Sequence, residues 1–110
     1  MEDRLREALG KMIPGFQGIF GTVLDQIILY GSVARGTQRY DSDVDIAVIV
    51  RRYTEDMHDR MIDFTVELEL EYNKVFSILL IEYDTFREWE NVLPFYQNMK
   101  KDGIMLWSAA

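Results

Sequence analysis

Apolar and polar residues follow the pattern of β-strands in two segments of the first half of the chain. Residues 23–30 contain the apolar run Ile27-Ile28-Leu29 and end just before a glycine. In residues 43–50, one face is apolar along its whole length, while the other face begins with Asp43 and Asp45. We therefore predict two strands, the second with a pair of carboxylates at its start.

Two segments of the second half also predict strands. Residues 75–81 are nearly continuous in apolar side chains. Such a run is typical of a strand that is buried on both faces, so we expect it to be central in the sheet. Residues 104–107, with the sequence Ile-Met-Leu-Trp, are expected to form an edge strand.

Residues 55–73 allow two interpretations. Apolar residues recur at helical spacing, but from Phe64 to Tyr72 they also alternate with polar residues, as in a strand. We predict a helix that Thr54 caps, because Met, Glu and Leu are strong helix formers and the helical spacing continues upstream.

Other segments carry the apolar spacing or the end signals of helices. Residues 3–13 are amphipathic, and Pro14-Gly15 is expected to end that helix. Residues 32–36 predict a short helix with Ser32 as its cap. A polar loop is expected after it, over residues 36–42.

Two more helices are predicted near the end of the chain. Thr85, with Glu88 three residues later, is expected to cap a short helix over residues 85–91. Pro94 is expected to begin another helix, which ends near Gly103. Together these elements indicate one α/β domain over residues 1–110, with a small mixed sheet and helices on its flanks.

Composition narrows the class of protein. The chain has 110 residues, 48% of them apolar and none of them cysteine, which indicates a globular domain without disulfides or thiolate metal ligands. No apolar run is long enough to span a membrane, and no signal-peptide pattern occurs. We therefore expect a cytoplasmic protein with no membrane partner.

The formal net charge of -7 bears on the choice of partners. An acidic chain repels phosphate backbones, so direct binding to nucleic acid is not expected. The charge would favour a basic protein partner, and the alternative is that it serves only solubility.

Candidate chemistry gathers around the turn Gly31-Ser32. Gly31 lets the backbone approach phosphate groups closely, and Ser32 can donate its hydroxyl and its N–H. Arg35, one turn along the short helix, could reach a phosphate oxygen. Asp43 and Asp45, spaced by two on a strand, point to one face and can bind one Mg²⁺ or bridge two. The sequence therefore predicts a site for a metal-bound nucleoside triphosphate.

Three other features have simpler explanations. His58, the only histidine, is expected on an exposed helix face and not in a metal site. Asp41 is expected to have a turn role in its polar loop. The aromatic residues of the last third mostly indicate core packing, and a part of them could cover a partner or a second copy in a homo-oligomer. These aromatic residues are Phe86, Trp89, Phe95, Tyr96 and Trp107.

The pattern Gly31-Ser32-x10-Asp43-x-Asp45 resembles the signature of the nucleotidyltransferase (polymerase-beta-like) superfamily. The short chain and residues 91–104 also resemble the MNT proteins of HEPN/MNT toxin–antitoxin pairs. The resemblance implies a nucleotidyltransferase fold, triphosphate on the Gly-Ser turn and Mg²⁺ on the two aspartates. It further implies transfer of AMP from ATP to a tyrosine of a HEPN ribonuclease toxin.

One departure from that family concerns the third carboxylate on a following strand. Here the matching position is occupied by Ser77, and Glu82 has the opposite parity. Glu67, Glu69 and Glu71 are candidates to replace it, but on a helix they are more simply solvated charges. We therefore predict a two-carboxylate site, in which nucleotide binding survives better than rate.

Three hypotheses follow. The first is a Mg²⁺-dependent adenylyltransferase that modifies a partner protein, a HEPN-type toxin. The second is a binding module of the same fold, which would neutralise the toxin by occlusion. The third, adenylyl transfer to a small molecule such as an aminoglycoside, usually needs a second domain to hold the acceptor.

Overall fold

The computed structural model describes residues 1–37 and 43–109. It contains a four-stranded mixed sheet. The pairs β1–β2 and β1–β4 are antiparallel, and the pair β2–β3 is parallel. The strand order is β3-β2-β1-β4. The strands are β1 (Leu24–Tyr30), β2 (Val44–Val50), β3 (Phe76–Glu82) and β4 (Ile104–Ser108).

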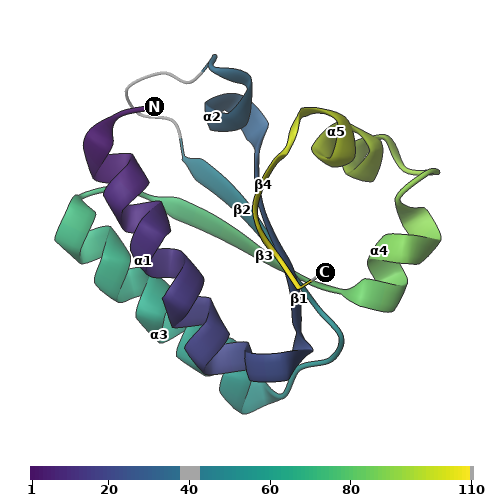
Figure 1. The fold of residues 1–110 in the computed structure, drawn as a ribbon, viewed down its shortest axis with the longest axis horizontal. Helices are drawn as coiled ribbons and strands as arrows, with labels where there is room; N and C mark the ends of the chain where they lie inside the picture. The colour runs from purple at the N-terminus through teal and green to yellow at the C-terminus, as the bar shows by residue number, and fades with distance from the viewer. Residues whose placement is uncertain (38–42, 110) are drawn as a thin grey trace.

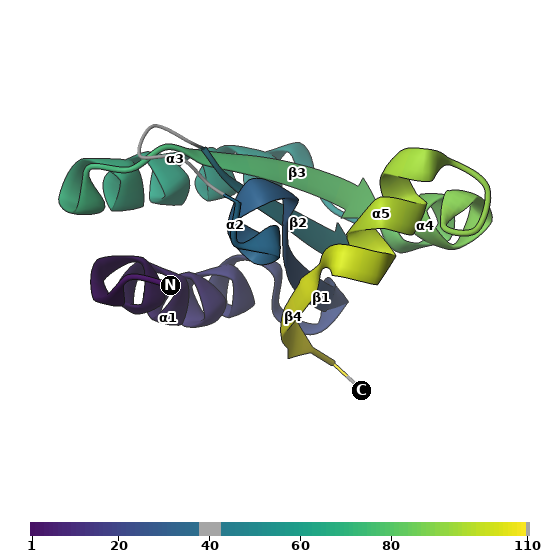
Figure 2. The ribbon, with the colours of Figure 1, turned by 90° about the horizontal axis from the view of Figure 1, so that it is seen from above.

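Helices lie on both faces of this sheet, so the predicted small α/β fold is confirmed (Figures 1 and 2). The long helices α1 and α3 cover one face, and the short helices α4 and α5 lie on the other. A 3₁₀ turn η1 (Gly21–Val23) leads into β1. The helices are α1 (Asp3–Phe20), α2 (Gly31–Arg35), α3 (Glu55–Tyr72), α4 (Tyr83–Trp89) and α5 (Pro94–Asp102).

Two hydrophobic cores lie on opposite sides of the sheet. The larger core packs α1 and α3 against the sheet and includes fully buried Met12 and Phe16. The smaller core lies beneath α4 and α5. It consists of Ile28, Ala47, Ile49, Ile81, Phe86 and Met99. The face of β2 that begins with the acids is therefore also buried farther along the strand.

β3 is an edge strand, so the prediction that it is central was wrong. Its side chains are apolar because both faces of the strand contribute to a hydrophobic core. Phe76 belongs to the larger core and Ile81 to the smaller one. The strand nevertheless leaves apolar surface uncovered, since Leu79 is exposed. A continuous apolar run thus indicates cover on both faces but says nothing about neighbours on both edges.

The first helix continues through Pro14 to Phe20, so the prediction that Pro14-Gly15 ends it was wrong. Pro14 is exposed, and the carbonyl left without its amide partner can be hydrated. Burial of Phe16 and Phe20 extends the helix across the core. Gly15 is needed for packing, since a Cβ there would overlap the ring of Phe64 on α3.

The helical interpretation of residues 55–73 is confirmed, and the Met57 N–H donates to Thr54 Oγ1 at 3.2 Å as a cap. Two other predicted caps were wrong. α2 already begins at Gly31, so Ser32 lies inside it, and Thr85 lies inside α4. The predicted helix from Pro94 and the predicted edge strand at the end of the chain are both confirmed, as α5 and β4.

Most of the predicted loop over residues 36–42 falls outside the described residues. Gly36 ends α2 in the left-handed region at φ 73°, and the Thr37 N–H donates to the Ser32 carbonyl at 2.9 Å. The proposed turn role of Asp41 stays a prediction, because Asp41 is not among the described residues.

Candidate active site

The turn between β1 and α2 packs directly against the carboxylate of Asp45. Gly31 has φ 76°, a conformation that residues with a side chain rarely adopt. A Cβ at Gly31 would overlap the Asp45 carboxylate. Two reasons therefore require glycine at position 31. The backbone has a positive φ, and a side chain would occupy the space that the Asp45 carboxylate fills.

Asp43 and Asp45 lie where the end of β1 meets the start of β2. Asp43 is exposed just before β2, while Asp45 is half-buried and pairs with Tyr30 of β1. Partial burial raises the pKa of Asp45 above its ordinary value, and the negative charge of Asp43 raises it further. The charge of Arg35 acts in the opposite direction. The structure thus brings Gly31, Asp43, Asp45 and Arg35 together.

Ser77 occupies the place beside the two acids. It pairs in register with Asp45 across the parallel strands, and its hydroxyl lies 3.5 Å from Asp43 Oδ2. In the described ranges 1–37 and 43–109, His, Cys, Asp and Glu side chains form no group of three or more that could hold a metal. This part of the chain therefore offers two carboxylates and one hydroxyl.

The acids proposed as substitutes have other surroundings. Glu69 accepts a hydrogen bond from the Phe76 N–H at 3.0 Å, and Glu71 forms an ion pair with Lys11 at 2.5 Å. Both lie on α3, across the sheet from the two aspartates, and Glu67 is exposed on the same helix. Glu82 is exposed at the far end of β3. None of these residues completes the site.

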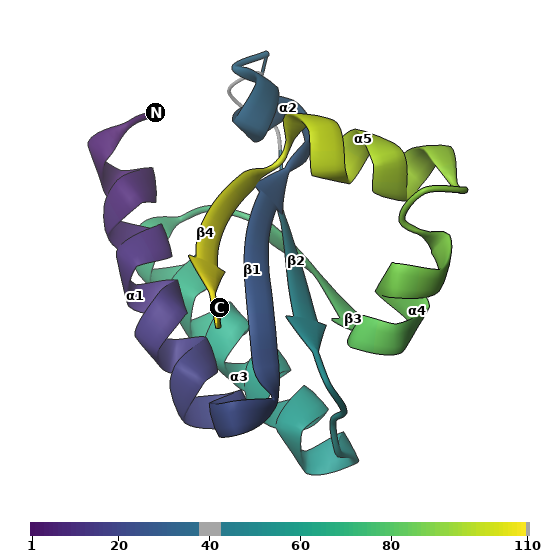
Figure 3. The same ribbon diagram turned by 45° about the vertical axis from the view of Figure 1, so that its right-hand side comes forward.

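Aromatic rings cluster beside Asp45, and the sequence did not predict this cluster of Tyr30, Phe95 and Tyr96. Burial and the charge of Asp45 both raise the pKa of the Tyr30 hydroxyl. The Tyr30 ring meets Phe95 of α5 edge to face at 5.7 Å, and Phe95 meets Tyr96 at 5.5 Å. Figure 3 shows α2 and α5 at the same end of β1. The position of Tyr30, next to the glycine turn, is the signal that could have revealed it.

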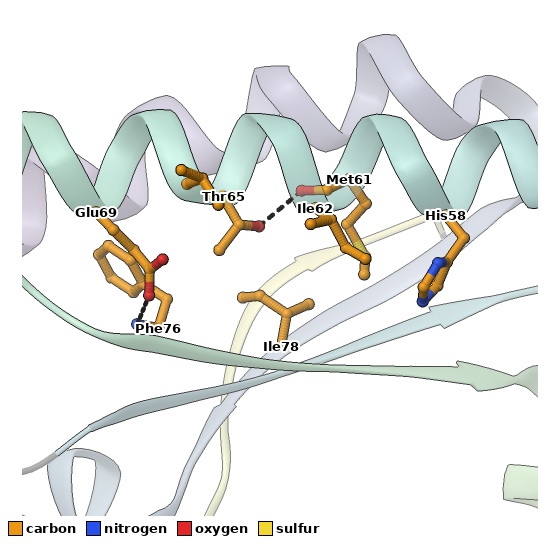
Figure 4. Close-up of a pocket in the computed structure, with 8 residues that line it drawn as sticks. His58, Met61, Ile62, Thr65, Glu69, Phe76 and Ile78 are labelled. Atoms are coloured by element: carbon orange, nitrogen blue, oxygen red, sulfur yellow. Dashed lines mark hydrogen bonds between the residues drawn. The ribbon is translucent and has the colours of Figure 1, made fainter.

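His58 is half-buried on α3, where the sequence predicted an exposed position, and its Nδ1 lies 3.8 Å from Asp59 Oδ1. It borders a groove of about 280 Å³ between α3 and β3 (Figure 4). Ile62 and Ile78 also line this groove, which lies on the opposite side of the sheet from Asp45. It is therefore separate from the candidate active site.

The residues present fit a Mg²⁺ ion. Mg²⁺ prefers oxygen ligands and usually takes one or two carboxylates, with waters or phosphate oxygens in the other positions. Asp43 and Asp45 are held close enough for the charge of one to raise the pKa of the other, and a bound cation would relieve that repulsion. Ser77 offers a further oxygen.

Residues 21–110 match the family model for Polymerase beta, Nucleotidyltransferase. The chain therefore belongs to this nucleotidyltransferase family, a class of nucleotidyl-transferring enzymes, as the motif indicated. The match begins at η1 and takes in the whole sheet together with both halves of the candidate site, Gly31-Ser32 and the two aspartates.

Two proteins of Methanocaldococcus jannaschii are similar to this chain, and each bears the name "Putative protein adenylyltransferase". The first is 26% identical over 101 residues, which are 92% of this chain and 96% of the relative. The second is 34% identical over 84 residues, which are 74% of this chain and 57% of that relative.

Solved structures share the fold. A chain from the crystal structure of a toxin–antitoxin complex with AMP-PNP gives a TM-score of 0.58 at 23% identity, covering 90% of this chain and 73% of that one. Another chain, from a tri-AMPylated Shewanella oneidensis HEPN toxin in complex with MNT antitoxin, gives a TM-score of 0.56 at 17% identity, covering 94% of this chain and 72% of that one.

Among the described residues, none of the helices has the length and apolar character that a membrane-spanning helix needs.

Proposed function

We propose that this chain transfers AMP from ATP to a hydroxyl of a partner protein, with Mg²⁺ as its metal, and that it acts as the antitoxin of a HEPN-type toxin. The observation that carries the proposal is the contact of the Gly31 turn with the Asp45 carboxylate. The contact supports the proposal because a glycine turn of this kind can bind phosphate and a carboxylate beside it can bind Mg²⁺. A donor such as ATP and a chain without cysteine fit the expected cytoplasmic location.

The names of similar proteins support the acceptor class. Two relatives are named as protein adenylyltransferases, and structures with the same fold come from complexes of a HEPN toxin with an MNT antitoxin. One of those toxins is described as AMPylated, and another complex contains AMP-PNP.

The chemistry assigns a role to each residue of the site. The acceptor hydroxyl forms a bond to the α-phosphorus of ATP, the bond to pyrophosphate breaks so that pyrophosphate leaves, and the hydroxyl proton passes to solvent water. Gly31 and Ser32 would hold the triphosphate, and Arg35 would neutralise a phosphate oxygen. Asp43 and Asp45 would hold Mg²⁺, which offsets the charge of the phosphates. Without an acid at position 77, the proton lacks a dedicated base, so slow transfer is expected.

An α-³²P-ATP labelling assay tests the proposal. The wild-type chain, Mg²⁺ and the protein encoded by the neighbouring reading frame are mixed, and label on the partner is measured. We expect label with the wild type and none with the double variant Asp43→Ala/Asp45→Ala. The absence of label, together with a toxin that the double variant still neutralises, would reject the enzyme.

That outcome would favour the second hypothesis, a nucleotide-binding antitoxin that neutralises its partner by occlusion. Ser77 in place of the third acid is the observation that supports it. Binding of AMP-PNP and Mg²⁺ separates the two, because both functions require binding but only the enzyme requires transfer. Transfer to a small molecule has less support, because both similar proteins are named as protein adenylyltransferases.

A further inference from the structure

Four aromatic rings connect the end of β1 to the smaller hydrophobic core. The Tyr30 ring meets Phe95 edge to face at 5.7 Å, and Phe95 meets Tyr96 in the same way at 5.5 Å. Tyr96 in turn meets Phe86 at 5.7 Å, and Phe86 is buried in the smaller core. Edge-to-face contacts favour defined ring orientations. The series of rings is therefore anchored in the core at one end and reaches the residue before Gly31 at the other.

Phe95 is the most accessible ring of this series. It remains 48% exposed although two other rings contact it, whereas Tyr30 and Tyr96 are half-buried. An aromatic side chain has only two rotatable bonds, so it contacts a ligand at a low cost in conformational entropy. Phe95 therefore offers an aromatic surface whose position is already set by its neighbours.

Tyr30 joins this surface to the candidate active site. It pairs with Asp45 across β1 and β2, so the two side chains lie on the same face of the sheet. Burial raises the pKa of the Tyr30 hydroxyl, and the charge of nearby Asp45 raises it further. The Asp45 carboxylate in turn lies against Gly31. The contacts thus run in order from the glycine turn through Asp45 and Tyr30 to Phe95, and Figure 3 shows α2 and α5 at the same end of β1.

The parts of a nucleoside triphosphate follow one another in the same order. The phosphates are at one end, the ribose is in the middle and the base is at the other end. With the phosphates at the Gly31 turn and at Asp45, the ribose lies beside Tyr30 and the base reaches Phe95. Bases are flat aromatic rings that stack on the aromatic side chains of proteins.

We propose that Phe95 stacks on a purine base of the nucleotide donor and that Tyr30 and Tyr96 hold the Phe95 ring in place. The inference rests on the proposed function for the position of the phosphates, and it adds the residue that selects the donor. Differences in stacking strength give modest preferences among bases. The larger purine ring has more area to stack, so purine triphosphates bind more tightly than pyrimidine triphosphates.

A partner protein is the other candidate occupant of this surface. Val92 and Leu93, just before α5, are 60% and 40% exposed, and a partner that covered Phe95 would also contact them. The base is favoured because Phe95 is linked through Tyr30 to Asp45, whereas Leu93 has no ring to join the series. Leu93→Ala is therefore the matched control for Phe95→Ala.

Calorimetry with two probes separates the base from the phosphates. AMP-PNP carries a base, and inorganic tripolyphosphate does not; both are titrated with Mg²⁺. Phe95→Ala should weaken AMP-PNP binding about tenfold and leave tripolyphosphate binding unchanged. Leu93→Ala should bind both probes as the wild type does. Unchanged AMP-PNP binding in Phe95→Ala, equal weakening of both probes, or equal effects of the two variants would overturn the proposal.

Two further measurements examine the stacking itself. In Phe95→Trp, AMP-PNP should quench the fluorescence of the added indole and tripolyphosphate should not, with the wild type supplying the background of Trp89 and Trp107. Quenching no greater than in the wild type would overturn the proposal. The wild type should bind CTP more weakly than ATP, and this difference should shrink in Phe95→Ala. Equal binding of CTP and ATP by the wild type would overturn the assignment of a purine.

The two proposals can fail separately. AMP-PNP binding that depends on Phe95, with no adenylyl transfer to a partner, would retain the base contact and reject the transfer. Transfer by Phe95→Ala with the wild-type KM for ATP would retain the transfer and reject the base contact. Weaker binding of the partner to Phe95→Ala and Leu93→Ala without nucleotide, with AMP-PNP binding unchanged, would assign the surface to the partner and overturn the inference.

Discussion

The two faces of the sheet differ in how completely helices cover them. On one face, α1 and α3 have 18 residues each and bury a core that contains Met12 and Phe16. On the other face, α4 and α5 have seven and nine residues and cover only part of the sheet. Asp45 lies on the second face, at the end that stays accessible. The well-covered face stabilises the fold, and the partly covered face leaves room for chemistry.

The largest expected effect tests the covered face. Phe16 is fully buried, with its ring 5.7 Å from that of Phe64. Phe16→Ala should lower the free energy of unfolding by about 3–5 kcal/mol, because it removes buried apolar contacts and leaves a cavity. Urea denaturation measures the change. Phe95→Ala on the other face is the control and should cost less than about 1 kcal/mol, since Phe95 is half exposed. Similar losses would contradict the comparison.

The next prediction adds chemistry to the open face. Ser77→Asp places a carboxylate beside Asp43 and opposite Asp45, where it can accept the proton of the acceptor hydroxyl. A general base contributes about 10²–10⁴-fold, so single-turnover adenylyl transfer should rise by about 10²-fold. Ser77→Asn has a similar shape without the charge and should give no increase. Equal rates of the two variants would argue against a missing base.

A third prediction separates the two reasons for glycine in the β1–α2 turn. Gly31 and Gly36 have similar φ values, but only at Gly31 would a Cβ meet Asp45. Both Gly→Ala changes should cost about 1–2 kcal/mol of stability from the left-handed backbone. Gly31→Ala should in addition weaken binding of AMP-PNP and Mg²⁺, measured by calorimetry. Equal binding by both variants would show that the contact with Asp45 does not matter for the nucleotide.

The smallest expected effect concerns pH. The folded state raises the pKa of Asp45, so it binds this proton more tightly than the unfolded state does. This group's contribution to stability is therefore fully present below the unfolded pKa of about 3.9 and is lost as pH rises through the higher folded pKa. Asp45→Asn should be more stable than the wild type at pH 7, by less than about 1 kcal/mol, and the difference should vanish near pH 3. Urea midpoints across this range measure it, and a difference independent of pH would contradict the assignment.

Local signals in the sequence were enough for much of the fold. The alternation over residues 43–50, the cap at Thr54 and the glycine turn each show in residues close together in the sequence, and each was predicted correctly. The parity of Ser77 was also confirmed, because alternation along a strand fixes which side chains share a face.

The errors concern contacts between distant segments. Pro14 does not end α1, because burial of Phe16 and Phe20 against the sheet outweighs the lost hydrogen bond. β3 is an edge strand, although its apolar run looks central, because helices and not strands cover it. Tyr30 is next to Asp45 through pairing of β1 with β2. The sequence around a single strand or helix does not indicate which distant segment it will contact.

The central position of β2 bears on how the site responds to local fluctuations. β2 is paired on both edges, and all of its residues after Asp45 are buried. Segments of this kind open only with the whole molecule in native-state hydrogen exchange, whereas edges open more readily. Asp45 therefore lies in a segment that we expect to be among the last to unfold locally. The Asp45 carboxylate should keep its position under mild heat or denaturant, until the fold itself is lost.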